Sequence, residues 1–138
     1  MSEMSDDFKE IIENFLVETN ELIEKLSNDF INFEEHSDEL EIVHDIFRTV
    51  HSIKGTAGFL GFYNMQHVSH GMEDILNKLR HEEIELTENI MDVLYMGLDS
   101  LQTIVADVEE GNSEKSNVEA VVSNLKRVLE GEIVEIKR

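Results

Sequence analysis

Apolar residues recur at spacings of three and four along most of the chain, which is the period of helices that bury one face. The first such stretch runs from about Ser5 to Phe33, with Ser5 as the expected N-cap and Asp6 and Asp7 in the first turn. Its apolar positions are Phe8, Ile11, Ile12, Phe15, Leu16, Leu22, Ile23, Leu26, Phe30 and Phe33. The polar residues 34–38 then end the pattern. This stretch predicts one long amphipathic helix.

Four further helices are predicted by the same period and by residues that favour helix ends. Their expected ranges are residues 38–60, 64–79, 88–111 and 117–130. The residues expected at their starts are Ser37, Thr87 and Ser116, and those expected at their ends are Gly61, Gly111 and Gly131. Ser116 and Glu119 have the spacing of a capping box.

The chain contains no proline that would force a helix to break. Five helices with short connections pack most simply as an antiparallel bundle. We therefore expect an all-α fold, a four-helix bundle extended by a fifth, C-terminal helix. Residues 1–131 would form this one domain, and residues 132–138 would start a linker to absent domains or form a disordered tail. One bundle can bury the apolar faces, so we expect a monomer.

Charge and composition narrow the classes of partner. The sequence has 31 acidic and 11 basic residues, and its formal net charge of −20 repels nucleic acid and anionic membrane surfaces. It has no cysteine, and so neither disulfides nor thiolate metal sites. No apolar run approaches the roughly 20 residues that span a bilayer. We expect a cytoplasmic protein that binds neither nucleic acid nor membranes.

The stretch from His51 to Phe62 departs from a plain helical pattern, because Gly55, Gly58 and Gly61 fall close together. Each glycine inside a helix costs about 1 kcal/mol relative to alanine, so the three glycines need a reason. We interpret Gly61 as a helix cap. Gly55 and Gly58 lie too early for that role, and we interpret them as clearing space beside His51 for a visiting protein.

Helical geometry places His51 near polar residues of the next helix. At roughly 100° per residue, His51 points about 130° away from the centre of the apolar face of its helix. Lys54 lies one turn further on the same outward face. If the following turn is centred near residue 61 or 62, His51 is level with about residue 72, close to His70 and Glu73. The hairpin thus brings His51, Lys54, His70 and Glu73 close together.

Those four side chains suit phosphorylation of an imidazole. A neutral ring attacks phosphorus through one nitrogen, and a carboxylate such as Glu73 that accepts a hydrogen bond from the other nitrogen fixes the tautomer. Lys54 can offset the charge of the phosphoryl group. The glycines would let another protein bring its own aspartate and magnesium to the phosphorus. On this hypothesis the domain needs no nucleotide site of its own.

The segment Phe47–Leu79 resembles the histidine-containing phosphotransfer (HPt) domain, most closely the form found at the amino terminus of chemotaxis kinases of the CheA type. The shared motifs are His51-x-x-Lys54-Gly55, the run Ala57-Gly58-Phe59-Leu60-Gly61-Phe62, and His70-x-x-Glu73. The resemblance extends, with less specificity, over nearly the whole chain. It implies that His51 is the phosphoacceptor and Glu73 its hydrogen-bond partner, with Lys54 and His70 completing the polar network.

In this family a separate kinase catalytic domain, commonly in the same polypeptide, binds ATP and magnesium and phosphorylates the histidine. The phosphoryl group then moves to an aspartate of response-regulator receivers such as CheY and CheB, which bind their own magnesium. We expect this domain to bind no cofactor, and we expect Gly55, Gly58 and Phe62 at the docking surface. Phe62 could instead close the hairpin as part of the core.

No nucleotide-binding motif is present, so the chain is not expected to act as a kinase alone. It looks like one domain of a histidine kinase in a chemotaxis two-component system, or like a stand-alone relay module of a multistep phosphorelay.

Two other functions stay open at this point. His51, His70 and Glu73 could hold zinc or iron inside the bundle. Ferritin-like sites, however, take Glu-x-x-His from two helices, whereas here the order is reversed and occurs once. A purely structural helical adaptor is the other alternative. Stoichiometric metal in the purified protein would favour the first, and failure to accept phosphate without any bound metal would favour the second.

Overall fold

The computed structural model describes residues 3–111 and 113–135. Over these ranges the chain forms five helices and no β-strand. The helices are α1 (Glu3–Glu35), α2 (Leu40–Leu60), α3 (Tyr63–Arg80), α4 (Glu88–Gly111) and α5 (Glu119–Leu129). Each corresponds to one of the predicted stretches, and the predicted all-α fold is confirmed.

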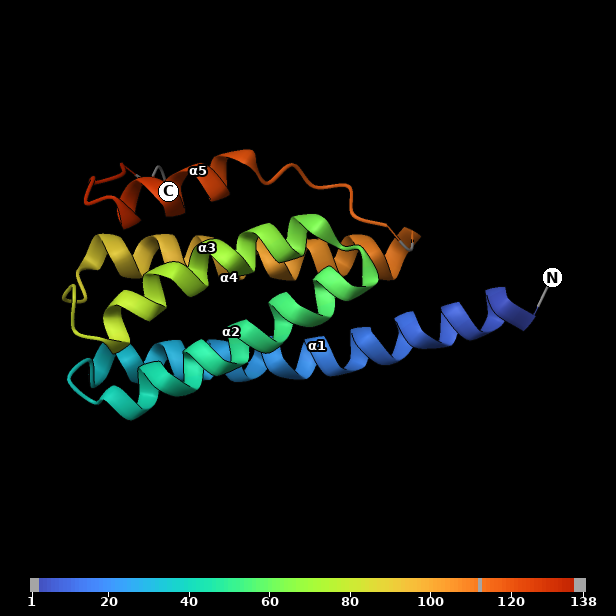
Figure 1. Cartoon of the computed structure of the whole chain (residues 1–138), viewed down its shortest axis with the longest axis horizontal. Coiled ribbons are helices and arrows are strands. Elements are labelled where there is room, and N and C mark those ends of the chain that lie inside the picture. Colours follow the sequence, from blue (N-terminus) through green and yellow to red (C-terminus); the bar gives the residue numbers. More distant parts are fainter. Residues whose placement is uncertain (1–2, 112, 136–138) are drawn as a thin grey trace.

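The first four helices close a ring, in which α1 and α3 each contact both α2 and α4. Successive helices run in opposite directions (Figure 1). Helix α5 lies outside this ring, against α3 and α4. The arrangement is the predicted antiparallel four-helix bundle with a fifth helix added. Its most extensively paired neighbours are α2 and α3, which form the hairpin that carries His51.

The ring encloses side chains that are almost fully removed from solvent. The largest are Phe30, Phe33, Leu26, Ile46, Ile53, Met65, Met72, Ile75, Leu76, Leu94, Leu101 and Ile104. Burial of each such side chain contributes about 1.5–3 kcal/mol, which outweighs the weaker helix preference of the β-branched residues among them. Because these residues follow the helical period, the core fixes the rotation of α2 and α3 about their axes. It thereby fixes the direction of their outer faces.

The turn between α2 and α3 is held by Gly61 and Phe62. Gly61 has a φ angle of +83°, in the left-handed region that glycine adopts without steric cost. Its N–H donates to the carbonyl of Gly58, and the N–H of Phe62 donates to the carbonyl of Ala57 at 2.8 Å. The ring of Phe62 stacks on Phe15 of α1, with the centroids 5.2 Å apart. The predicted cap at Gly61 is confirmed, and the turn is anchored to α1.

The residues at the helix starts differ in part from the prediction. Helix α1 begins before Ser5, so Ser5 is not its N-cap, and the side chain of Ser5 lies outside the described residues. Helix α2 has Glu39 at the N-cap position, without a side-chain cap bond, so Ser37 does not cap it. Thr87 does cap α4, because its Oγ1 accepts a hydrogen bond from the N–H of Ile90 at 3.1 Å.

The start of α5 shows why Ser116 does not form a capping box. Its hydroxyl donates to Oδ2 of Asp107 on α4 at 2.6 Å, and its N–H donates to the same oxygen at 2.9 Å. Ser116 is therefore bound to α4 and not to the first turn of α5. The N-cap position of α5 is Val118, which forms no side-chain cap bond. Just before it, Asn117 Oδ1 accepts a hydrogen bond from the N–H of Glu119 at 2.9 Å.

The residues that follow the predicted domain boundary at residue 131 lie against the bundle. After Gly131, which has a φ angle of +93°, the chain turns back onto the bundle, and Val134 is buried. The side chain of Asn89 on α4 pairs with the backbone of Val134 in both directions, donating to its carbonyl at 2.6 Å and accepting from its N–H at 3.0 Å. The domain therefore includes Val134. The last part of the predicted tail, residues 136–138, lies outside the described residues.

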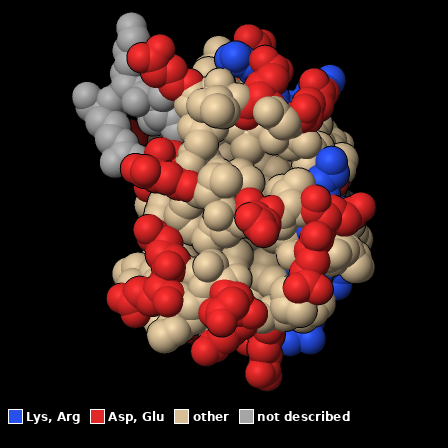
Figure 2. Space-filling view, turned by 90° about the vertical axis from the view of Figure 1, so that its left-hand side faces the viewer, with Lys and Arg blue, Asp and Glu red and all other residues tan. Residues whose placement is uncertain are grey.

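Carboxylates are spread over the surface. Figure 2 shows the end of the bundle that carries the α1–α2 and α3–α4 connections, where acidic side chains predominate and the few basic ones lie at the top and along the right-hand side of the view. Within the described ranges, no helix combines the length and the apolar character needed to cross a membrane.

Candidate functional site

His51 lies on α2, and its side chain points out of the bundle. Its neighbours Val50 and Ile53 are buried in the core, which turns the imidazole toward solvent and leaves 61% of the side chain exposed. The outward direction therefore follows from the register of the apolar residues on α2.

Glu73 on α3 joins His51 to Lys54. Its Oε2 lies 2.6 Å from His51 Nδ1, and its Oε1 accepts a hydrogen bond from Lys54 Nζ at 2.7 Å. Only 12% of the Glu73 side chain is exposed, whereas Lys54 is 25% exposed. The hairpin thus brings together His51, Lys54 and Glu73, with one nitrogen on each carboxylate oxygen.

The surroundings of Glu73 determine the tautomer of His51. Partial burial works against ionisation of Glu73, but the hydrogen bonds from Lys54 and His51 outweigh it and lower the pKa of this carboxyl below its ordinary value. An ionised carboxylate can only accept hydrogen bonds. His51 Nδ1 must therefore carry the proton, which leaves the lone pair of the neutral ring on Nε2.

Nε2 is thereby the ring nitrogen with a lone pair available. Since 61% of the side chain is exposed, the ring lies on the outer side of α2, where a second protein can reach it. The ammonium of Lys54 is bonded to Glu73, so in this structure its charge stabilises the carboxylate. Its predicted role toward a phosphoryl group stays a prediction.

Phe47 and Arg80 also contact this site, and both were missed by the sequence analysis. The Phe47 ring lies one helical turn before His51, with ring centroids 6.1 Å apart and an angle of 11° between the planes. The guanidinium carbon of Arg80, at the end of α3, lies 3.8 Å from the centroid of Phe47. Arg80 Nε also donates to Asn77 Oδ1 at 2.9 Å. The four-residue spacing of Phe47 and His51 was the available signal.

His70 does not join the network, which corrects the prediction. Its Nε2 lies 3.5 Å from Asp74 Oδ2, and the two side chains are 60% and 44% exposed. Residues three apart on a helix differ in direction by about 60°. Glu73 therefore faces α2, while His70 borders a cavity of about 290 Å³ whose other wall is α5.

The three residues expected at a docking surface lie in different surroundings. A Cβ added at Gly55 would meet nothing within 4 Å, so this position is open. A Cβ added at Gly58 would lie 2.5 Å from Nε2 of Gln66 on α3, so Gly58 makes room for its own neighbouring helix. Phe62 is 7% exposed and stacked on Phe15, which favours the alternative that it closes the hairpin as part of the core. Phe59 is instead 86% exposed.

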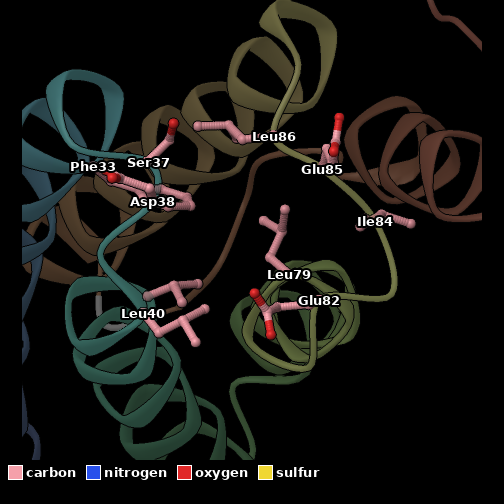
Figure 3. A pocket seen from close by; sticks show the side chains of 10 residues that line it. Phe33, Ser37, Asp38, Leu40, Leu79, Glu82, Ile84, Glu85 and Leu86 are labelled. Atoms are coloured by element: carbon pink, nitrogen blue, oxygen red, sulfur yellow. The ribbon is translucent and has the colours of Figure 1, made fainter.

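A cavity lies at the end of the bundle that carries the α1–α2 and α3–α4 connections. A cavity of about 530 Å³ lies between the α1–α2 connection, α3 and the α3–α4 connection (Figure 3), and His51 is not among the residues that line it. Within the described residues, no group of three or more histidine, cysteine, aspartate or glutamate side chains could hold a metal ion. The site around His51 is an open surface that suits a protein partner.

Comparisons with known proteins agree with this arrangement. A family model described as the Hpt domain matches residues 10–133. The chain is 38% identical over 112 residues to the sensor histidine kinase CheAY of Helicobacter pylori, an alignment that covers 81% of this chain and 14% of that protein. The CheA phosphotransferase domain from Thermotoga maritima superposes with a TM-score of 0.71 at 30% identity, covering 79% of this chain and 99% of that one.

A third similarity is to a domain solved with a partner. The phosphorylated P1 domain of CheA3 from R. sphaeroides, in complex with CheY6, superposes with a TM-score of 0.81 and covers 88% of this chain and 97% of that one. The two sequences are 18% identical, so this similarity supports the fold alone. The chain spans 14% of the length of its Helicobacter relative, while it matches nearly the whole of the isolated Thermotoga domain.

Proposed function

The chain belongs to the Hpt family as a phosphotransfer domain of the CheA type, and we propose that its His51 takes a phosphoryl group from an ATP-dependent kinase domain and passes it to an aspartate of a response-regulator receiver. The observation that supports this most is the hydrogen bond between His51 Nδ1 and Glu73 Oε2, at 2.6 Å. That bond leaves Nε2 as an exposed nucleophile.

In the first transfer, the lone pair of Nε2 forms a bond to the γ-phosphorus of ATP. The bond between that phosphorus and the bridging oxygen breaks, and ADP leaves with the electron pair. The ring becomes positively charged as the bond forms, and the carboxylate of Glu73, which still accepts the Nδ1 proton, stabilises that charge. Lys54 keeps the carboxylate ionised and lies one turn from the new phosphoryl group.

In the second transfer, a carboxylate oxygen of the receiver attacks the same phosphorus. The nitrogen–phosphorus bond breaks, its electron pair returns to Nε2, and His51 is again neutral with its proton on Nδ1. Nothing in this sequence of steps requires a nucleotide site in the domain itself. We propose that the kinase domain binds ATP and magnesium, and that the receiver binds the magnesium of the second step. Use of ATP would place the domain in the cytoplasm.

The surface offered to CheY-like or CheB-like receivers includes Gly55 and Phe59. A standard interface covers about 800 Å² on each partner, and so extends roughly 15 Å from its centre. Phe59 lies eight residues after His51, or about 12 Å along the helix axis. A receiver centred on Nε2 of His51 would therefore reach Phe59, and the missing side chain at Gly55 opens the space between them.

Phosphoryl transfer from labelled ATP tests this function. A kinase core of the CheA type that lacks its own phosphotransfer domain is the donor, and His51→Gln is the control. We expect label that is lost in acid and kept in alkali, as phosphohistidine requires, on the wild type alone. Equal labelling of wild type and His51→Gln, or no labelling of folded wild type by any active core of this type, would overturn the proposal.

A further inference from the structure

We propose that Phe47 and Arg80 are positioning residues for the phosphoacceptor, which fix the plane of the His51 ring while Glu73 fixes its tautomer. This inference rests on the proposed function, because it concerns the reactivity of the same ring. It is carried by a different set of contacts, the stack of Phe47 on His51 and of Arg80 on Phe47.

The hydrogen bond to Glu73 cannot hold the ring by itself. It restrains one atom, Nδ1, and leaves the imidazole able to turn about its Cβ–Cγ bond within the range of angles that a hydrogen bond tolerates. The side chain is 61% exposed, so packing from the core does not prevent that turn. Because in-line attack on phosphorus needs Nε2 aimed within narrow limits, a second support should increase the rate.

Phe47 supplies a flat surface in the required place. The angle of 11° between the two rings means that they are nearly parallel, and stacked aromatic pairs favour such offset parallel arrangements. Phe47 is partly buried and packs against the core, so its own ring is better held than that of His51. Any turn of the imidazole out of this plane gives up the contact with Phe47.

Arg80 holds the other end of this stack across the hairpin. Side chains on a helix lean toward its N-terminus, so the guanidinium of Arg80 lies about one turn before its own Cα, level with Phe47. A cation 3.8 Å above an aromatic centroid is within the range of favourable cation–π contact. The hydrogen bond from Nε to Asn77 restricts the guanidinium further. Arg80 thus ties α3 to the ring that supports His51.

The test uses the full chain as the substrate of the CheA-type kinase core, with kcat and KM measured separately. Phe47→Leu keeps an apolar side chain but removes the flat face. We expect kcat to fall roughly tenfold, as for a misplaced reacting group, with KM unchanged. Phe47→Tyr keeps the ring and should restore the wild-type kcat. Arg80→Gln should lower kcat about threefold through the lost cation–π contact, and Arg80→Lys should recover most of it.

Nitrogen NMR distinguishes a change in the orientation of the His51 ring from a change in its tautomer. Phe47→Leu and Arg80→Gln should both keep the proton of His51 on Nδ1, whereas the ring-proton resonances of His51 should move in Phe47→Leu because the ring current of Phe47 is gone. A wild-type kcat in both variants, or loss of the Nδ1–H tautomer in either, would overturn the inference. If Phe47→Leu fails to fold, Arg80→Gln decides alone. An unlabelled wild type would instead count against the proposed function.

Discussion

Two histidines on the hairpin of α2 and α3, His51 and His70, are almost equally exposed but differ in the carboxylate that each one contacts. His51 is 61% exposed and contacts Glu73, a carboxylate with only 12% of its side chain exposed, at 2.6 Å. His70 is 60% exposed and lies 3.5 Å from Asp74, which is 44% exposed. Solvent weakens the second pair far more than the first. The burial of the carboxylate, and not the exposure of the histidine, therefore distinguishes the reactive position.

Replacing each imidazole in turn should give the largest difference between His51 and His70. His51→Gln should take up no acid-labile phosphate from the kinase core, because the nucleophile is gone. His70→Gln, the matched variant on the other side of the hairpin, should be labelled as fast as the wild type. Labelling of His51→Gln, or loss of labelling in His70→Gln, would show that the two positions have been assigned wrongly.

Replacing the two carboxylates, Glu73 and Asp74, should give the next largest difference in the rate of phosphorylation. Glu73→Gln replaces the acceptor that holds the Nδ1 proton, so the His51 tautomer is no longer fixed, and kcat for phosphorylation should fall roughly 10²-fold. Asp74→Asn should leave kcat unchanged. The measurement is the steady-state rate of labelling by the same kinase core. Equal rates for Glu73→Gln and Asp74→Asn would show that the burial of the carboxylate does not distinguish His51 from His70.

The exposed ring of Phe59 tests whether the surface around His51 binds the receiver. Phe59→Ser should slow transfer from phosphorylated domain to a limiting receiver roughly tenfold, as the loss of an interface anchor does. Its free energy of unfolding should change by less than about 0.5 kcal/mol. Ile133→Ser removes another apolar side chain of similar exposure, 84% against 86%, and should not affect transfer. Equal slowing by both would contradict a specific docking role for Phe59.

Substitution of Gly55 should have a smaller effect, and the sign of the change in the free energy of unfolding tests whether the position is open. Since a Cβ would meet nothing there, Gly55→Ala should raise the free energy of unfolding by about 1 kcal/mol through helix propensity. Gly58→Ala should gain less, because the side chain of Gln66 must move aside. Urea denaturation of both variants measures the difference. Destabilisation by Gly55→Ala would mean that the position is not open.

The smallest effect concerns acid pH. Burial opposes ionisation of Glu73, but the hydrogen bonds and charges of Lys54 and His51 together outweigh it and lower the pKa of this carboxyl from its ordinary value of 4.5. A carboxyl with a lower pKa when folded stabilises the native state above its ordinary pKa, and this contribution is lost as the pH falls through the folded value. The stability difference between wild type and Glu73→Gln should therefore be constant above pH 4.5 and shrink below it. A difference that grows on acidification would contradict the sign.

The sequence predicted the helices because the apolar period is repeated over many residues in each. It placed His51, Lys54 and Glu73 together because a tight hairpin fixes which levels face each other. Single positions were less predictable. Ser116 has the spacing of a cap but is bound by Asp107, and Phe59 and Phe62 differ in burial through the turn between them. The position of His70 outside the network could be predicted only from the rotation of α3 about its axis.

The contacts that depend on side-chain reach across helices could not be predicted from spacing alone. Arg80 meets Phe47 only because its long side chain leans back along α3. Val134 is buried through a pair of hydrogen bonds with Asn89, and its segment is too short to show a hydrophobic period.

In the proposed mechanism, Glu73 holds the proton of His51 on Nδ1 and so makes Nε2 the atom that is phosphorylated. The most direct measurement is nitrogen and phosphorus NMR of the phosphorylated domain with labelled histidine. We predict a phosphorus bonded to Nε2 of His51, with Nδ1 still protonated. A phosphorus on Nδ1 of His51, or on any other histidine, would contradict the account.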